Sequence, residues 1–350
     1  MAWRLQRFPS PKPSVAIAVR VAAIMLALIV GGVVVAVSGH NPLALGGQVI
    51  TSTFGSSFGL EDLGLLATPL ILTGLAVMIT RRIGLWNIGA EGQFYAGALA
   101  AAAIGLFVEG PAWLMLPAMF LAGVAGGMAW ITIPTLARAF VGVNELITTL
   151  LLNFVATLLV YYFATGPWRD RGAGTLGSTP RIRYEMPELW GMVHWGFAIA
   201  VALTVLVAAV LSFTRWGYEV RISGANPENA LYAGIPVRRR IIAVMLLSGA
   251  VAGIAGMLEV AGTVHRLQGG ISNNFGYLGI IVAVLARTSC LGVLAAAALM
   301  AFILNAGIIL QTQGLTTSAI VALTGLVLMF TAIGDEFAHY RLVRADRVTA

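Results

Sequence analysis

Residues 88–108 read IGAEGQFYAGALAAAAIGLFV, a run of apolar and small residues long enough to cross the hydrocarbon core of a membrane. A segment inside a bilayer has no water to bind its backbone N–H and C=O groups, so it must pair them internally. Because a helix does this within one segment, the run predicts a membrane-spanning helix. Similar runs recur along the chain and predict an all-α fold.

The composition excludes an ordinary water-soluble domain. Of the 350 residues, 59% are hydrophobic and only 10% are charged, and the mean hydropathy is +0.91. So few polar side chains cannot cover the surface of a soluble globule. The short alternating segments of an outer-membrane barrel are not seen in the sequence. We therefore expect a polytopic helical membrane protein.

Ten apolar segments are candidate membrane spans. The first follows a basic segment, but its apolar run is longer than that of a secretory signal, so we interpret it as an anchor. The eighth is short and interrupted by glycine, which leaves a re-entrant segment as the alternative to a crossing made partly of broken helix. The ten segments cover residues 15–37, 63–79, 88–108, 113–136, 146–163, 193–213, 241–262, 274–286, 290–310 and 318–333.

The basic residues predict the orientation of these spans, because cytoplasmic loops are enriched in Arg and Lys. With both termini in the cytoplasm, 16 basic residues fall inside and 5 outside. An odd number of spans would place the basic C-terminal tail outside. The inside residues are Arg4, Arg7, Lys12, Arg20, Arg81, Arg82, Arg138, Arg215, Arg221, Arg238, Arg239, Arg240, Arg287, Arg341, Arg344 and Arg347. The outside residues are Arg169, Arg171, Arg181, Arg183 and Arg266.

Two connections are longer than the others. The external loop 165–192 mixes charges, Gly, Pro and Trp, which fits either a surface that docks a partner or a spacer. The cytoplasmic loop 214–240 contains Asn226 and Pro227, a pair that typically starts a helix, and Gly234, which typically ends one. This bracketed element predicts a short surface helix that docks a cytoplasmic partner.

Several polar side chains fall within or beside the apolar spans. A carboxylate at membrane depth is costly, so Glu91 is a functional candidate; the alternative is a structural role at a helix break, with backbone amides as partners. Asn144 is a candidate N-cap, with Glu145 in the first helical turn. Asn153 has no helix-end role, so it either bonds a neighbouring helix or faces a solute path.

The seventh and eighth spans add two more features. Gly249 and Gly253 have the spacing of a tight helix-packing motif. Glu259, Asn273 and Asn274 are candidate mouth residues of a path, although a wetted outer rim explains them equally well.

The sequence lacks the residues that several other classes of function need. Cys290 is the only cysteine, and no Cys/His cluster has zinc-like spacing, so we expect no disulfide and no metal site. There is no GxxxxGK[ST] phosphate loop and the only lysine is Lys12, so we expect no ATP hydrolysis by this chain. The cations do not form a patch interleaved with aromatic residues, which argues against nucleic acid as a partner.

Four stretches carry a family resemblance. They read GLWNIGAEGQ at 84–93, GVNELITTLLLNFVA at 142–156, RISGANPENALYAGIPVRRR at 221–240 with SGAVAGIAGMLEV at 248–260, and NNFGYLGIIVAVLA at 273–286. In this order and spacing they resemble the permease subunits of bacterial ABC importers for nucleosides and simple sugars. The chain departs from the family at 286–293, ARTSCLGV, where Arg287 and Cys290 replace the usual Gly, polar turn and Pro.

The resemblance implies a single transmembrane permease domain over residues 1–350, with about ten helices in inverted repeats, in a bacterial inner membrane. In our topology the second and seventh spans run in opposite directions, as inverted repeats require. The subunit would form the translocation path and hold no cofactor, while a partner ATPase binds ATP and Mg²⁺. The other partners would be a second permease of different sequence, an extracytoplasmic solute-binding protein and membrane lipid.

The resemblance also implies roles for two groups of residues. Those that would couple to the ATPase are Gly224, Asn226, Pro227, Ala230 and Gly234. Those that would line the solute path are Asn87, Glu91, Gln93, Asn144, Asn153 and Asn274.

Two alternatives remain open from the residues. An ion-coupled secondary transporter of a small polar solute would use Glu91, Glu145 or Glu259 as its titrating group, but it would not need the helix within 214–240. A scaffold subunit without transport activity has only the lack of catalytic groups in its favour.

Overall fold

The computed structural model describes residues 3–7, 13–172, 177–287 and 289–344. Lys12, Arg347 and residues 173–176 of the external loop lie outside this described part. The chain forms two compact units, Met1–Gly59 with Ile303–Ala350, and Leu60–Phe302. Each unit is described by itself below.

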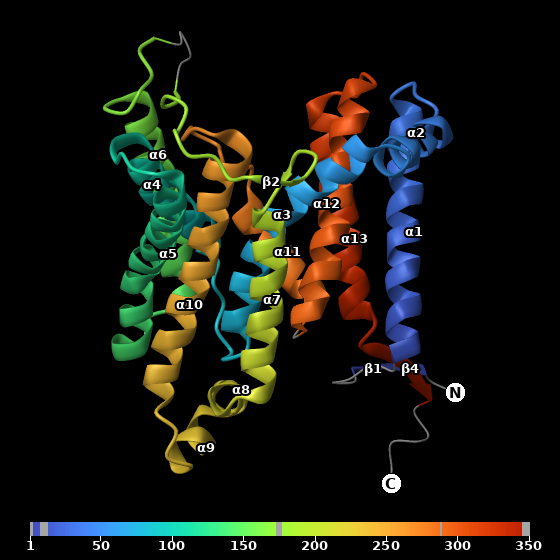
Figure 1. Ribbon diagram of the computed structural model, residues 1–350. Coiled ribbons are helices and arrows are strands. Elements are labelled where there is room, and N and C mark those ends of the chain that lie inside the picture. The colour runs from blue at the N-terminus through green and yellow to red at the C-terminus, as the bar shows by residue number, and fades with distance from the viewer. Residues whose placement is uncertain (1–2, 8–12, 173–176, 288, 345–350) are drawn as a thin grey trace. The chain divides into compact units, whose positions relative to one another are not determined.

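The first unit joins the two ends of the chain. Helix α1 (Pro13–Val37) packs along α13 (Thr317–Phe337), and β1 (Trp3–Arg7) pairs antiparallel with β4 (Tyr340–Arg344) (Figure 1). The sequence analysis did not predict this strand pair. Val35, Leu45 and Leu315 form the buried core of this unit.

Helix α2 (Pro42–Phe54) of the first unit was also not predicted. Its start follows from local chemistry, because Pro42 occupies the first helical position and the Asn41 side chain accepts hydrogen bonds from the N–H groups of Leu43 and Ala44. The angle between α2 and residues 21–37 of α1 is 116°.

The second unit contains most of the helices. In chain order they are α3 (Ser57–Arg81), which begins at the boundary, α4 (Ala90–Phe107), α5 (Ala112–Leu136), the π-helix η1 (Ala137–Val141), α6 (Glu145–Thr165), α7 (Gly196–Phe213), α8 (Arg215–Ala225), α9 (Pro227–Tyr232), α10 (Val237–Leu258), the π-helix η2 (Glu259–Val264), α11 (Phe275–Ala286) and most of α12 (Cys290–Thr312). A small hairpin, β2 (Glu188–Trp190) with β3 (Val193–His194), precedes α7.

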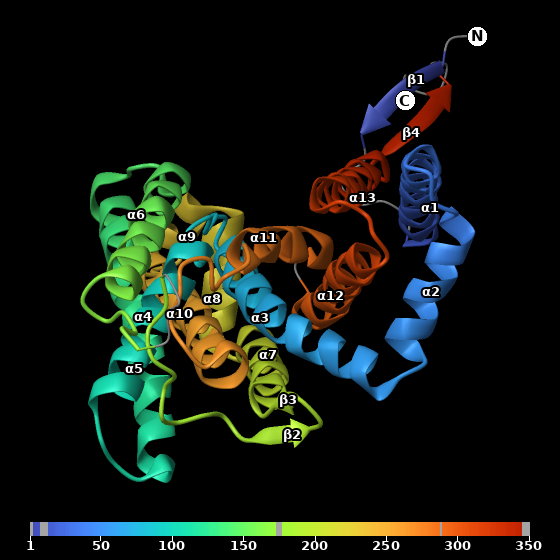
Figure 2. The same ribbon diagram turned by 90° about the horizontal axis from the view of Figure 1, so that it is seen from above.

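Helices α4, α5 and α10 of the second unit pack closely against one another, with α6 beside α4 (Figure 2). Glycines let their backbones touch: a Cβ on Gly253 would clash with the carbonyl oxygen of Gly123, and one on Gly127 would clash with that of Gly249. The predicted packing role of Gly249 and Gly253 is confirmed. These close approaches hold α10 tightly against α5.

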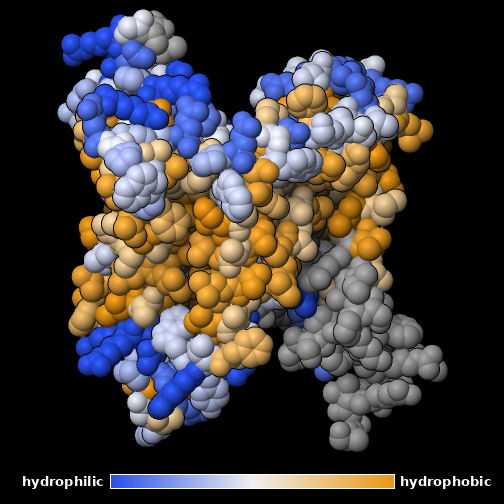
Figure 3. Space-filling view, in the orientation of Figure 1, coloured by the Kyte–Doolittle hydropathy of each residue, from blue (hydrophilic) through white to orange (hydrophobic). Residues whose placement is uncertain are grey.

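A helix covers each of the ten predicted spans. Within the described residues, six helical segments are long and apolar enough to cross a membrane, and the bent pair α1–α2 would make a seventh if it is one span. Helix α11 is shorter, with 12 residues. The face of the second unit that includes α7 shows an apolar belt between hydrophilic ends (Figure 3). The chain is a multi-pass membrane protein, and the number of ten crossings stays a prediction.

The region that departs from the family forms the junction of α11 and α12. Arg287 ends α11 with a positive φ of 57°, a conformation uncommon for residues with a side chain. Cys290 starts α12 as a buried free thiol. Residue 288 lies outside the described residues.

Candidate translocation path and coupling element

A non-helical segment links α3 to α4, and we call its residues 82–89 the connector. Ile83, Leu85, Asn87 and Gly89 are buried, and the residues between them are more exposed. Residues 82–84 form a turn that follows α3, residues 85–87 have neither helix nor turn, and residues 88–89 form a turn before α4. The connector therefore returns from the end of α3 through the interior of the second unit to the start of α4 (Figure 1).

Asn87 and Gln93 bond to each other through both of their amide groups. The Asn87 Nδ2 donates to Gln93 Oε1 at 2.7 Å, and the Gln93 Nε2 donates to Asn87 Oδ1 at 2.9 Å. Asn87 also donates to the Ser248 hydroxyl at 2.8 Å, which in turn donates to the Ala76 carbonyl at 2.6 Å. The two amides thus join the connector to α4, α10 and α3.

Asn153 reaches from α6 to the same place. Its Oδ1 accepts from the Gly92 N–H at 2.9 Å, and its Nδ2 donates to the Ile88 carbonyl at 2.9 Å and to the Tyr277 hydroxyl at 3.3 Å. The side chain is 1% exposed. The interpretation of Asn153 as a bond between neighbouring helices is confirmed by these contacts.

Glu91 lies in the first turn of α4, 3% exposed, and its Oε2 accepts a 2.7 Å hydrogen bond from the Gly276 N–H in the first turn of α11. The starts of two helices, where N–H groups lack helical partners and anions are favoured, meet at this carboxylate. A Cβ on Gly276 would clash with the backbone of Glu91, so only glycine fits there. This geometry matches the structural interpretation of Glu91 at a helix break.

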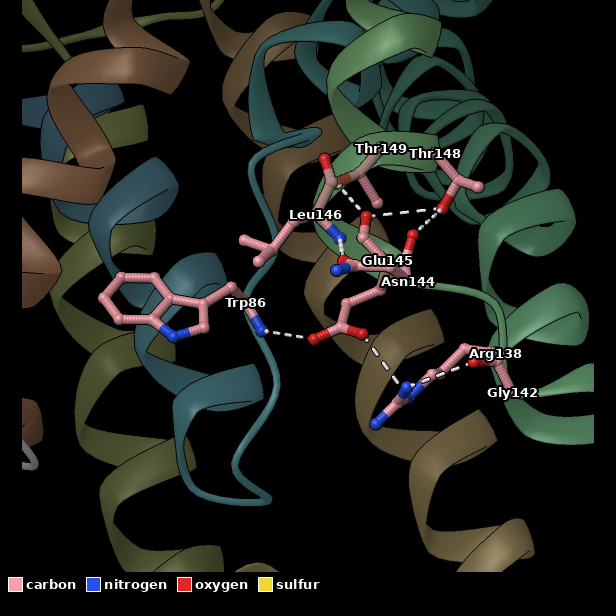
Figure 4. A network of polar contacts seen from close by, with 8 residues as sticks. All are labelled: Trp86, Arg138, Gly142, Asn144, Glu145, Leu146, Thr148 and Thr149. Carbon is pink, nitrogen blue, oxygen red and sulfur yellow. Dashed lines mark hydrogen bonds and ion pairs between the residues drawn. The ribbon is translucent and has the colours of Figure 1, made fainter.

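The start of α6 is the helix terminus that the sequence predicts. Asn144 Oδ1 accepts from the Leu146 N–H at 2.9 Å, as expected of an N-cap. Glu145 accepts from the Trp86 N–H at 3.4 Å and pairs with Arg138 at 3.4 Å (Figure 4). The first turn of α6 therefore bonds both the connector and η1.

Asn274 differs from the other predicted path residues. It stands at the N-cap position of α11 with an exposed side chain that makes no capping hydrogen bond, and its φ is +64°. Asn273 before it is also exposed and has a φ of +46°. Glu259 is 5% exposed and accepts from the Thr263 hydroxyl at 3.4 Å, so its surroundings are not those of a wetted rim.

The structure thus brings Asn87, Glu91, Gln93 and Asn153 together around the connector, with Asn144 at the neighbouring start of α6. Their polar groups bond other parts of the chain in this conformation. These hydrogen bonds hold the starts of α4 and α11 inside the protein. Asn274 is exposed beside them.

The predicted cytoplasmic helix is present as α9. Asn226 Oδ1 accepts from the Asn229 N–H at 3.0 Å, Pro227 stands at the first helical position, and Gly234 has a φ of +76°. Ala230 is buried beside Ile235. Leu231 and Tyr232 are 61% and 91% exposed, so α9 presents apolar surface beyond the ends of α7 and α10 (Figure 1).

Helix α8, which precedes α9, was missed by the sequence analysis. Its N-cap is Thr214, whose hydroxyl accepts from the Gly217 N–H at 3.1 Å, and Thr is a usual N-cap residue. Glu219 of α8 bonds Arg215 at 3.1 Å and Arg240 at the start of α10 at 2.7 Å. Helices α8 and α9 and the Gly234 turn form one unit, which we call the coupling element (residues 215–234).

The external loop lies on the second unit rather than standing away from it. Backbone hydrogen bonds join Thr179 to Leu267, Ile182 to His265 and Met186 to Ala261 at 2.8–2.9 Å. The Met192 N–H donates to a Glu61 carboxylate oxygen at 3.0 Å. Residues 179–186 of the loop therefore lie along residues 261–267, at the end of η2.

His194 anchors the end of this loop. Its Nδ1 accepts from the Gly196 N–H at 3.0 Å, and the ring packs on Gly262 of η2. Burial, with the charge of His265 as a second cause, lowers the pKa of His194 to about 4. The imidazole is therefore neutral at physiological pH.

Comparison with known proteins gives one consistent family. The model of a family described as "Branched-chain amino acid transport system / permease component" matches residues 59–332. A glucose ABC transporter permease of Haloferax volcanii is 35% identical over 92% of this chain and 88% of its own length. A guanosine ABC transporter permease of Bacillus subtilis is 32% identical over 79% of this chain and 82% of its own length.

A nucleoside ABC transporter permease of Lactococcus lactis is 27% identical over 89% of both chains. The glycine-lined helix packing, the buried helix starts and the coupling element all fall within the residues that the family model matches. This chain belongs to the family of ABC transporter permease components.

Proposed function

We propose that this chain forms the translocation path for nucleosides or simple sugars in an ATP-driven importer of a bacterial inner membrane. The proposal rests on the similarity of this chain, over most of its length, to permeases named for guanosine and glucose. The relatives give no support to the ion-coupled alternative, and the buried Glu91 has a structural partner in Gly276.

The energy would come from a cytoplasmic ATPase partner, because the sequence holds no phosphate loop of its own. The coupling element is the proposed docking site. Leu231 and Tyr232 give it exposed apolar side chains on a short helix with a fixed start and a fixed end. Exposed apolar and aromatic residues of this kind are typical anchors of protein interfaces. ATP and Mg²⁺ would bind only to the partner.

The chain would act as one permease domain with ten crossings and both termini in the cytoplasm, and the pairing of β1 with β4 supports an even number of crossings. A second permease of different sequence would complete the path. An extracytoplasmic solute-binding protein would dock near the external loop, where Trp190 and Trp195 are about half exposed.

We propose two different roles for the predicted path residues. Asn87, Glu91, Gln93 and Asn153 would shape the path by bonding other parts of the protein, and Asn144 would do so by capping its own helix α6. Asn274 would be able to meet a solute, because its side chain is exposed next to the start of α11.

The test is uptake by the complete transporter in liposomes. The tagged chain, co-expressed with the ATPase and permease that purify with it, should take up labelled guanosine or glucose when ATP and the binding protein are supplied. Uptake of the same solutes by this chain alone, driven by a pH gradient, would instead establish the ion-coupled transporter.

A further inference from the structure

We infer that the connector transmits movement of the coupling element to the paired starts of α4 and α11, with Gly224 as the positioning residue at its cytoplasmic end. The inference rests on the proposed ATP-driven function and names the route by which the partner would act on the path. Its support is a continuous series of contacts from α8 to Glu91.

The first contact joins two backbones directly. A Cβ on Gly224 of α8 would clash with the Arg82 carbonyl oxygen and would lie 2.8 Å from the Ile83 Cα. A Cβ on Gly84 would lie 3.4 Å from the Gly224 carbonyl oxygen. Because no flexible side chain separates the two segments, side-chain rotation cannot absorb a displacement of α8.

Ion pairs hold α8 as one body with the start of α10. Glu219 is 8% exposed and bonds both Arg215, within α8, and Arg240, in the first turn of α10. A charge this buried is costly to separate from its partners. A push on the coupling element therefore moves α8 as a unit against the connector.

Successive residues of the connector contact different helices. The Trp86 N–H bonds Glu145 of α6, the Asn87 side chain bonds Ser248 of α10, and the Ile88 carbonyl bonds Asn153 of α6. These bonds hold the middle and the far part of the connector, and the N–H groups of Ile83 and Leu85, which both donate to the Thr80 carbonyl at 3.1 Å, hold its start. A shift at Ile83 is therefore passed on toward Gly89 rather than taken up by a loose loop.

The far end of the connector leads into α4, whose first turn bonds the first turn of α11. Gln93 of α4 bonds Asn87, and Glu91 bonds the Gly276 N–H of α11. A simple turn between two helices would cap α4 locally, but Gly89 provides no side-chain cap and the partners come from α6 and α11. Moving the connector therefore moves the elements that surround the proposed path.

The experiment compares two variants at opposite ends of this route in the complete reconstituted transporter. Gly224→Ala adds a methyl group against Arg82 and Ile83, and Ser248→Ala removes the hydroxyl that Asn87 and Ala76 share. Both should lower the amount of solute taken up per ATP hydrolysed, by about tenfold and about fivefold respectively, while the complex stays assembled and hydrolyses ATP.

Two matched controls separate transmission from general damage. Gly46→Ala changes a helical glycine of α2 that has nothing within 4 Å of an added Cβ. Thr204→Val removes a buried hydroxyl whose partner among the described residues is the Ala200 carbonyl of the same helix, at 2.8 Å. Both controls should keep the ratio of uptake to ATP hydrolysis of the unmodified transporter.

The outcomes distinguish the inference from the proposed function. If the unmodified transporter takes up solute with ATP but Ser248→Ala keeps the normal ratio, the connector does not transmit, even if Gly224→Ala disturbs docking. If Gly224→Ala fails to assemble, Ser248→Ala decides alone. If the unmodified transporter shows no ATP-dependent uptake, the proposed function itself is overturned and the inference falls with it.

Discussion

Glu91 and Gly276, 185 residues apart in the sequence, join the first turns of α4 and α11 through one 2.7 Å hydrogen bond from the Gly276 N–H to the Glu91 carboxylate. This relationship answers why so apolar a span carries a carboxylate near its start. The anion is placed where two helix termini offer unpaired N–H groups, so it stabilises a break in the helical backbone inside the protein.

Replacing this carboxylate by an amide should leave transport active. In Glu91→Gln the side-chain oxygen can still accept from Gly276, and the lost charge at the helix start costs about 0.3–1 kcal/mol. ATP-driven uptake should therefore remain within about fivefold of the unmodified transporter. Complete loss of uptake in a folded, assembled Glu91→Gln transporter would instead identify a titrating role.

Asn153 should contribute to stability through several partners at once. Asn153→Ala leaves the Gly92 N–H and the Ile88 carbonyl without their side-chain partner inside the protein. An unsatisfied buried polar group costs about 1–3 kcal/mol, so the unfolding midpoint in detergent should fall by several degrees. The control is Thr157→Val, since the partner of this hydroxyl among the described residues is the Asn153 carbonyl of the same helix. Equal midpoints for the two variants would argue against the network.

The glycines between α5 and α10 should not tolerate a methyl group. Gly253→Ala would place a Cβ against the Gly123 carbonyl oxygen and 3.0 Å from the Gly127 Cα, both of them backbone atoms that cannot rotate away. We expect a destabilisation of about 1–3 kcal/mol or more, measured by thermal unfolding in detergent. Gly46→Ala, with open space around it, should be neutral or stabilising by about 0.5–1 kcal/mol.

Protonation of His194 in acid should lower the free energy of unfolding and destabilise the packing of the external loop. Its pKa of about 4 in the folded protein lies below the usual value of 6.5, so the unfolded state binds more protons between these values. Stability should be full above about pH 6.5 and should fall by about 1–2 kcal/mol between pH 7 and pH 5. Thermal unfolding across this range should show a smaller fall in His194→Gln; an identical slope would assign the pH effect to other groups.

Local patterns predicted much of the helical architecture. Apolar runs located a helix at each of the ten predicted spans, and the Asn226–Pro227 pair located α9. Asn144 was recognised as an N-cap because capping depends only on the next few residues. Helix α8 was missed because glycine at 217 and 224 lowers helix propensity, whereas Thr214 and the Glu219 ion pairs stabilise the helix in the fold.

The non-local features could not be read from spacing. β1 and β4 pair residues from opposite ends of the chain, and the partners of Glu91 and Asn153 lie on other helices. A polar residue in an apolar span shows that some partner is needed, but not which one. The contact between Gly224 and Arg82 also required the fold, since a glycine in a sequence does not reveal what approaches it.

The most direct test of the importer is the identity of the proteins that remain bound to this chain. A tagged chain, solubilised from its native membrane in a mild detergent, should copurify with an ATPase and a second permease in fixed stoichiometry. Substitution of the exposed Tyr232 by Ser should weaken recovery of the ATPase while leaving the second permease bound. Recovery of the chain alone, with no ATPase under any solubilisation condition, would contradict the ATP-driven importer.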